Sequence, residues 1–156
     1  MSIKTLIVCS WRLFNKTCDV LQPYGNLFIR IWVARVFFKA GLTKLSTWGT
    51  TVMLFTHEYK VPLVSPEIAA FLGTSTELVL PVLLVLGLGG RVPAFILFIF
   101  NIVAVISYPY LLTEEGVVGL NDHIYWGILL MVIVLYGTGK ISVDAAIKWW
   151  WQRKKG

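Results

Sequence analysis

Charge is scarce in this chain: Asp, Glu, Lys and Arg make up only 14% of its 156 residues, whereas they form about a quarter of ordinary soluble domains. Hydrophobic residues account for 57%, and the mean hydropathy is +0.75. This balance excludes a disordered tail and an ordinary soluble domain, and it indicates that lipid is the main solvent. The length suits one domain, of which four membrane-crossing helices of about twenty residues each would use roughly half.

Cysteine and histidine are also rare. Cys9 and Cys18 form no CxxC pair, so the sequence predicts neither a disulfide framework nor a redox cysteine pair. His57 and His123 are far apart and make a poor metal site unless a carboxylate or a thiol joins them. A haem ligand pair, a flavin motif and a nucleotide-binding loop are not found either. We therefore expect no metal site and no catalysis by this chain on its own, because electron transfer needs a cofactor.

Long apolar stretches alternate with short polar connections. The first, residues 26–45, contains Arg30, Arg35 and Lys39 and is the least apolar, yet it is long enough to cross a bilayer. Three further spans are expected at residues 68–90, 92–113 and 121–139. Each is bounded by helix-start or turn signals.

Helix-start signals are clearest at the second span. Ser65-Pro66-Glu67 supplies a capping hydroxyl, a proline in the first turn and an acid near the positive end of the helix dipole. Asn121 or Asp122 is expected to cap the fourth span. The polar connection 46–65 is expected to contain a short interfacial helix over residues 51–59.

Amphipathic helices are expected at both ends of the chain. In residues 1–22, Trp11 and Phe14 belong to an apolar stripe that suits the membrane interface, although the same stripe could pack on the bundle itself. Pro23 and its neighbours are expected to end that helix. Residues 141–156 contain three consecutive tryptophans before a basic end. The predicted fold is therefore all-α: a four-helix transmembrane bundle over residues 23–140 with amphipathic interfacial helices at 1–22 and 141–156.

The distribution of charge predicts the topology. Basic residues precede the first span, separate the second from the third and follow the fourth, whereas acids lie between the third and fourth. The basic residues are Lys4, Arg12, Lys16, Arg91, Lys140, Lys148, Arg153, Lys154 and Lys155, and the acids are Glu114, Glu115 and Asp122. The positive-inside rule then places both termini in the cytoplasm. Because topology explains the basic residues, we expect no nucleic-acid binding.

Charges inside the spans are the most informative residues, because each costs about 2.5–3.5 kcal/mol in hydrocarbon and tends to be paired and turned inward. Arg35 and Lys39 share one face of the first span, whereas Arg30 lies on another face, nearer the cytoplasmic side, where it can reach the headgroups. Glu77 lies at a depth similar to that of Arg35. We therefore expect an ion pair between Glu77 and Arg35 or Lys39.

A polar pocket is expected around Glu77. Pro81, four residues later, removes the usual helical donor from the Glu77 carbonyl, and Asn101 can supply a polar partner. The predicted ligand-binding residues are Arg35, Lys39, Glu77, Asn101, Tyr108, His123 and Trp48, with Phe37, Phe38 and Trp126 as further walls. Two alternatives stay open: a buried Arg–Glu pair can fix helix register without touching a ligand, and His123 can simply be solvated. Ser142 is expected to cap the last helix, where Asp144 and Lys148 are spaced to form an ion pair.

Several motifs in order resemble the DoxX family. They are Phe38-x-x-Gly41-x-x-Lys44-Leu45-x-x-Trp48, Glu58-Tyr59-x-Val61-Pro62, Glu77 followed by Pro81 and by Leu86-Gly87-Leu88, and Gly137-x-Gly139-x-x-Ser142-x-Asp144. The resemblance extends over residues 24–147. It implies a four-helix integral protein of the bacterial inner membrane. Relatives in that family are tied to quinone-linked sulfur oxidation, to thiol and oxidative-stress complexes, and to operons that make metal-binding peptides.

These observations lead to one main hypothesis and two alternatives. The main hypothesis is an accessory or anchor subunit of a redox system, binding a quinone-like or other small amphipathic ligand in its intramembrane pocket. The first alternative is a non-catalytic scaffold that recruits partner proteins, including those of a metal-handling or peptide-biosynthesis system, with the Glu58-Tyr59 loop as a docking point. The second is a small transporter subunit, which would have to be a homo-oligomer because four helices without a repeat are too few for alternating access.

Overall fold

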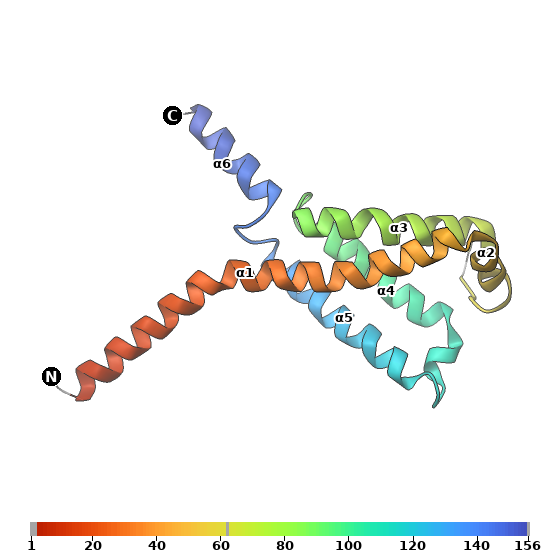
Figure 1. Cartoon of the computed structure of the whole chain (residues 1–156), viewed down its shortest axis with the longest axis horizontal. Coiled ribbons are helices and arrows are strands. Elements are labelled where there is room, and N and C mark those ends of the chain that lie inside the picture. Colours follow the sequence, from red (N-terminus) through yellow and green to blue (C-terminus); the bar gives the residue numbers. More distant parts are fainter. Residues whose placement is uncertain (1–2, 62, 156) are drawn as a thin grey trace.

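The computed structural model describes residues 3–61 and 63–155, which are helical apart from short connections (Figure 1). The elements are α1 (Ile3–Ser46), α2 (Trp48–His57), α3 (Pro66–Leu86), α4 (Val92–Ser107), the 3₁₀ helix η1 (Pro109–Leu112), α5 (Val117–Tyr136) and α6 (Val143–Lys155). No strand occurs within these ranges, so the predicted all-α class is confirmed. By length and composition α3 and α5 can each cross a membrane, and α4 is a shorter apolar helix.

Helix α1 is longer than expected. The break predicted at Pro23 is wrong, because α1 runs without interruption for 44 residues and contains this proline. A proline removes one backbone hydrogen bond and pushes the preceding turn aside, which bends a helix without ending it when the turns on either side persist. Figure 1 shows this bend between the red amino-terminal part and the orange remainder of α1. The boundary expected at residue 22 therefore falls inside a helix.

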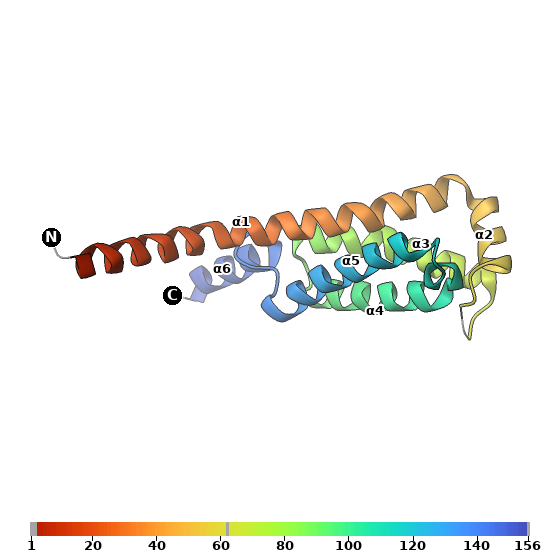
Figure 2. The same cartoon turned by 90° about the horizontal axis from the view of Figure 1, so that it is seen from below.

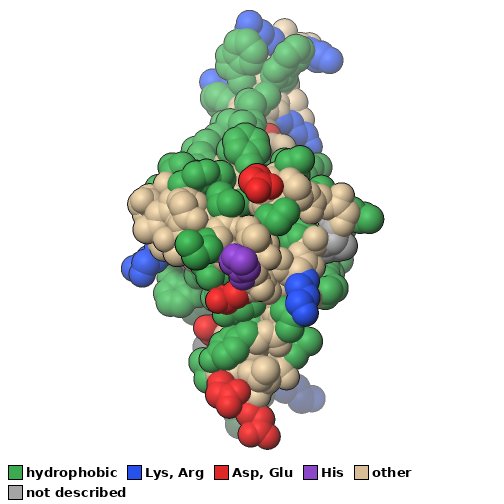
Figure 3. All heavy atoms as spheres, turned by 90° about the vertical axis from the view of Figure 1, so that its right-hand side faces the viewer, with side chains coloured by type: hydrophobic (Ala, Val, Ile, Leu, Met, Phe, Trp, Pro, Cys, Tyr) green, Lys and Arg blue, Asp and Glu red, His purple; other side chains and the backbone are tan. Residues whose placement is uncertain are grey.

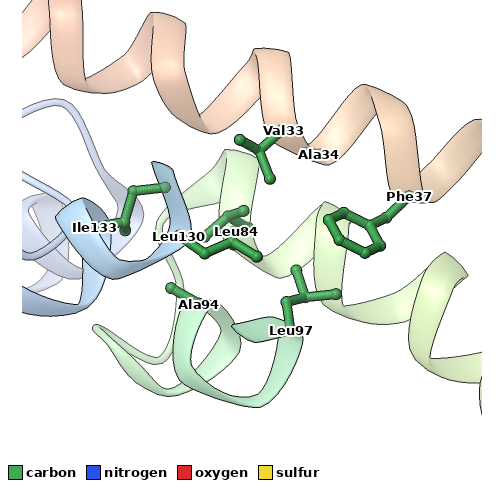
Figure 4. Packing of buried hydrophobic residues seen from close by; sticks show 8 residues of the cluster. All are labelled: Val33, Ala34, Phe37, Leu84, Ala94, Leu97, Leu130 and Ile133. Atoms are coloured by element: carbon green, nitrogen blue, oxygen red, sulfur yellow. The ribbon is translucent and has the colours of Figure 1, made fainter. Parts of the chain in front are cut away.

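Helices α3, α4 and α5 lie alongside the second half of α1, whose first part projects beyond them (Figure 2). Their shared core takes residues from all four helices. It consists of Val33, Ala34, Phe37, Leu84, Ala94, Leu97, Leu130 and Ile133, as Figure 4 shows. In lipid such a core is stabilised by close van der Waals packing rather than by exclusion of water. The small residues Ala34 and Ala94 are consistent with close packing at this point.

Helix α2 covers the end of the molecule opposite the two termini. Phe55 packs there against Ala69 and Ala70 at the start of α3. The short helix expected at 51–59 is present at Trp48–His57. Figure 3 views this end and shows acidic side chains and a histidine among hydrophobic ones. We call this end, which holds α2, η1 and the start of α3, the outer end.

The connection between α4 and α5 differs from the prediction. Helix α4 ends at Ser107 and not near residue 113, because Pro109 disfavours helical geometry at Tyr108, which has φ −117° and ψ 85°. Helix α5 begins at Val117 after Gly116, so the caps expected at Asn121 or Asp122 are wrong. The cap expected at Ser65 is confirmed, since its side chain accepts a hydrogen bond from the Ile68 amide.

A group of polar contacts at the other, inner end joins α1 to the turn after α3 and to the segment before α6. We call it the polar junction. It consists of Asn26, Arg30, Gly87, Gly89, Gly90, Gly137, Ile141, Ser142 and Asp144. Asn26 Nδ2 donates to the Gly137 carbonyl at 2.8 Å. Ser142 accepts from the Ala145 amide at 3.2 Å, which confirms it as the cap of α6.

Arg30 is the centre of the polar junction. The prediction that it reaches the headgroups is wrong: Arg30 is 0% exposed. Its guanidinium donates to the carbonyls of Leu84 at 3.2 Å and Val85 at 3.0 Å, and also to that of Ile141. The carbonyls of Leu84 and Val85 belong to the last turn of α3, where the regular helical donors run out and Leu84 receives only the capping Gly87 amide at 3.1 Å. Arg30 therefore satisfies the end of α3 from inside the bundle.

Asp144 closes the polar junction on the α6 side. It accepts hydrogen bonds from the backbone amides of Gly89 at 3.3 Å and Gly90 at 2.5 Å. No ion pair with Lys148 exists among the described residues, so the pairing expected within α6 is wrong. The amides of the tight turn compete successfully for the carboxylate because Lys148 is solvent-exposed and its attraction would be screened.

Candidate ligand cavity

The site begins with a close approach of two helices at Gly41. A Cβ atom added to Gly41 would lie 3.0 Å from Cβ of Glu77 and 3.0 Å from the side chain of Leu78. Because Gly41 has no side chain, the backbone of α1 can lie directly against the side chains of Glu77 and Leu78 on α3. One turn further along α1, this approach brings Lys44 within reach of Glu77.

Lys44 and Glu77 form an ion pair inside the bundle. Lys44 Nζ lies 2.5 Å from Oε1 and 2.6 Å from Oε2 of Glu77. The Glu77 side chain is 7% exposed and that of Lys44 is 22% exposed, so the pair is almost withdrawn from the surface. Such a pair attracts strongly because the surroundings have a low dielectric constant. It is the only ion pair within residues 3–61 and 63–155.

The predicted partners of Glu77 are therefore wrong. Arg35 and Lys39 are exposed on the outside of α1 and belong to no ion pair among the described residues. The prediction is correct in one respect, since Glu77 is buried and bound to a cation of the first span. The cation is Lys44, whose long side chain reaches inward from the outer end of α1.

A cavity of about 380 Å³ lies beside this ion pair. Residues of all five helices α1 to α5, of η1 and of the connection between α2 and α3 surround it. Its polar members are Lys44, Tyr59, Thr76, Glu77, Ser107, Tyr108 and His123. Aromatic walls are supplied by Phe37, Phe55, Phe100 and Trp126. A mostly apolar cavity with a few converging polar groups is the usual form of a small-molecule site.

Two tyrosines line the cavity at its outer end. The Tyr59 ring meets Phe55 edge to face at 4.8 Å and meets Tyr108 in the same way at 5.0 Å. Burial raises the pKa of Tyr59, and its neighbours Tyr108, Glu58 and Glu77 raise it further. Burial and the charge of Glu58 likewise raise the pKa of Tyr108. Both phenols therefore stay protonated at neutral pH and can donate hydrogen bonds.

His123 and Asn101 are joined by two hydrogen bonds. Asn101 Nδ2 donates to the His123 carbonyl at 2.9 Å, and Oδ1 of the same amide lies 2.8 Å from His123 Nδ1. A carbonyl only accepts, so it fixes which end of the amide faces it. Oδ1 must then accept from Nδ1, and the neutral ring carries its proton on Nδ1. Nε2 is left as an acceptor, and it has no partner among the described residues. The alternative that His123 is simply solvated is therefore disfavoured.

The other predicted site residues lie apart from the cavity. Asn101 is buried and does not line this cavity, but its two hydrogen bonds orient His123, which does. Trp48 and Phe38 are exposed and do not line the cavity, whereas the predicted walls Phe37 and Trp126 do. Sequence reasoning missed Lys44 and Tyr59 as cavity residues. Both occur in the motifs that carry the family resemblance, and this was the available signal.

The chain is thus an all-helical, membrane-associated protein with a buried ion pair beside an internal cavity. The family model described as DoxX matches residues 25–109, which is more than half of the sequence, and the chain belongs to the DoxX family. Neither a curated protein nor a solved structure matches it. The matched region holds Gly41, Lys44 and Glu77 of the site. It also holds Arg30 of the polar junction, whereas Ile141, which accepts from Arg30, and Asp144, which accepts from Gly89 and Gly90, follow the matched region.

Proposed function

We propose that this protein binds a small amphipathic molecule with a quinone-like head group in the cavity, and serves as an accessory or anchor subunit of a membrane redox system. The observation that carries the proposal is the Lys44–Glu77 pair facing an aromatic cavity. A pair that only fixed helix register would need no space beside it. Here about 380 Å³ adjoins the pair.

The polar groups around the cavity match a ring that carries oxygen substituents. Lys44, Tyr59 and Tyr108 are donors, whereas Glu77 and His123 Nε2 are acceptors. Ser107 adds a buried hydroxyl that has no hydrogen-bond partner among the described residues. A buried polar atom of this kind costs free energy until something pairs with it. The bound molecule would supply the redox chemistry, and the residues of this chain would bind and orient it.

We further propose a four-span placement in the bacterial inner membrane, with both termini in the cytoplasm. The polar junction brings the turn before Arg91 together with the loop that contains Lys140, at the end where the basic α6 begins. The exposed acids Glu114 and Glu115 lie between α4 and α5, towards the opposite end. This separation of charge is what the positive-inside rule requires. In α6, Arg153 and Lys154 stack on Trp149 and Trp150, as suits a helix at the headgroups.

The scaffold alternative depended on the loop after α2 as a docking point. Tyr59 of that loop lies half-buried against the cavity, and the Lys60 amide donates to the Ser107 carbonyl at 2.7 Å. These contacts favour a role of the loop in closing the cavity. No comparable observation favours transport.

Mass spectrometry of copurifying molecules tests the binding proposal. The protein is purified in mild detergent, its lipophilic contents are extracted, and quinones are quantified per chain. We expect a quinone with the wild type and at least a tenfold loss with Glu77→Gln. Glu67→Gln, which changes an exposed acid at the start of the same helix, should retain it. Absence of quinone from the wild type, or equal amounts with Glu77→Gln, would remove the proposal.

The two histidines offer a second matched comparison. His123→Phe removes the acceptor at the cavity wall, whereas His57→Phe changes an exposed residue at the end of α2. We expect the first variant to lower the recovery of ligand and the second to leave it unchanged.

A further inference from the structure

Within residues 26–45 of α1, Arg35 and Lys39 are the charged residues that the fold leaves exposed. With Glu77 bound to Lys44, neither has a counter-charge among the described residues. They are four residues apart, so they share one face of the helix. Ile31, Trp32 and Leu42 are exposed alongside them.

The depth of Arg35 makes its exposure costly. In the four-span placement proposed above, residues 26–45 of α1 cross the bilayer. Arg35 then lies about 14 Å from either end of this stretch at a rise of 1.5 Å per residue. Lys39 is nearer the outer end and can extend its side chain towards the headgroups. Arg35 is too central for this, and an arginine at the bilayer centre normally faces protein or a polar cavity rather than lipid.

A second copy of this chain does not offer the missing carboxylate. Glu77 is buried against Lys44, while Glu67 and Asp122 lie near the outer ends of α3 and α5. A symmetric dimer through this face would also place Arg35 and Lys39 of one copy against the same residues of the other, and like charges repel. The occupant must therefore be a different chain with an acid at the right depth.

We propose that the face of α1 formed by Ile31, Trp32, Arg35, Lys39 and Leu42 binds a transmembrane helix of another protein that carries a carboxylate near the bilayer centre. Polar pairs of this kind join helices in lipid. An apolar helix surface cannot do so by the hydrophobic effect, because it is solvated as well by lipid as by another helix. This inference rests on the proposed membrane placement but is independent of the ligand in the cavity.

Synthetic transmembrane peptides test it directly. The probe is a leucine-rich helix with one central Glu, and its matched control carries Gln instead. The protein is placed in phosphatidylcholine vesicles and labelled at Cys9 in a Cys18→Ser background, since both cysteines are free and exposed. Energy transfer to the labelled peptide then measures association. We expect association with the Glu peptide to be about tenfold tighter than with the Gln peptide.

Two double variants separate this face from a general effect of charge. Arg35→Leu/Lys39→Leu should abolish the preference for Glu. Arg12→Leu/Lys16→Leu removes an Arg and a Lys with the same spacing from the projecting part of α1 and should keep it. Equal association of the wild type with both peptides, or a preference that survives Arg35→Leu/Lys39→Leu, would overturn the inference. Self-association that requires Arg35 would overturn the choice of occupant.

The membrane placement is tested separately. Arg35→Cys in a Cys9→Ser/Cys18→Ser background should resist a water-soluble maleimide in vesicles and react once detergent is added. Rapid reaction without detergent would refute the proposed placement and the inference with it. Protection combined with equal peptide association would refute the inference alone.

Discussion

Lys44 on α1 binds both carboxylate oxygens of Glu77 on α3, at 2.5 and 2.6 Å, in the interior of the bundle. The two residues are 33 positions apart, and the contact depends on the close approach of the helices at Gly41. It joins the two longest helices at the wall of the cavity. The stability of the fold and the chemistry of the cavity are therefore coupled through one pair.

Loss of one partner of this pair should be strongly destabilising. Lys44→Met leaves the Glu77 carboxylate buried without a counter-charge, and we expect the free energy of unfolding to fall by about 3–5 kcal/mol. Lys44→Met/Glu77→Gln should recover much of that loss, because no charge is then left unpaired. Unfolding in mixed detergent micelles, followed by circular dichroism, measures both. Lys39→Met is the matched control and should change stability little. An equal loss with Lys39→Met would show that the pair has no special role.

Gly87 should tolerate no side chain. It has φ +65°, and a Cβ there would lie 2.5 Å from both Arg30 Nη1 and Ser142 Cβ. Gly87→Ala combines backbone strain of about 1–3 kcal/mol with displacement of the Arg30 guanidinium. Gly25→Ala has open space and a helical backbone, so it should leave stability unchanged or raise it by up to about 1 kcal/mol. Thermal unfolding of the two variants gives the comparison, and similar midpoints would contradict the role assigned to the polar junction.

Asp144 should hold the start of α6 to the inner end of the bundle. Asp144→Ala removes the charged acceptor of the Gly89 and Gly90 amides, and a hydrogen bond to a charged group contributes about 1.5–3 kcal/mol at most where water can replace it. We expect trypsin to cleave after Lys148 at least tenfold faster in this variant. The cleavage rate is followed by mass spectrometry. Asp19→Ala, an exposed acid of α1, should show the rate of the wild type; if Asp144→Ala does too, α6 is held by other contacts.

The raised pKa values of the half-buried Tyr59 and Tyr108 predict a loss of stability in alkali. The folded state holds the protons of Tyr59 and Tyr108 above their ordinary pKa, whereas the unfolded chain releases them near pH 10. Above about pH 10 the folded state therefore binds more protons than the unfolded chain, so the free energy of unfolding falls as pH rises through this range. Below about pH 10 both states hold these protons, and the stability contribution of the two phenols is fully present. Ultraviolet absorbance should show phenolate forming late in the folded protein.

Variants assign this alkaline behaviour to residues. Tyr59→Phe and Tyr108→Phe should each remove part of the late absorbance and flatten the decline of stability with pH. Tyr24→Phe changes an exposed residue of α1 and serves as the control. A decline that persists unchanged in Tyr59→Phe/Tyr108→Phe would assign it to other groups.

The helical elements could be predicted because their signals are local. The cap at Ser65, the turn after α3, the short helix α2 and the cap at Ser142 each follow from a few adjacent residues. The break at Pro23 was predicted wrongly because a local signal reports a lost hydrogen bond, not whether the flanking turns persist. The predicted start of α5 was wrong for a similar reason, since the helix begins after Gly116 without a side-chain cap.

The candidate site was predicted only in part because it depends on how the helices fit together. Burial of Glu77 followed from the cost of a charge in hydrocarbon, but its partner did not. Arg35 matches Glu77 in estimated depth, whereas the approach at Gly41 and the length of the Lys44 side chain decide the contact. Asp144 likewise had a plausible neighbour in Lys148, yet it binds amides more than fifty positions away.

The clamp at Arg30 has a consequence for how the protein is made. Its guanidinium donates to the carbonyls of residues 84, 85 and 141, so the last of its acceptors is synthesised 111 positions after it. Until residue 141 is made, the Arg30 guanidinium can reach the carbonyls of Leu84 and Val85 but lacks its third acceptor. Closure of the inner end therefore has to wait for this segment, and a nascent chain that stops before residue 141 lacks one of the contacts that hold α1 in place.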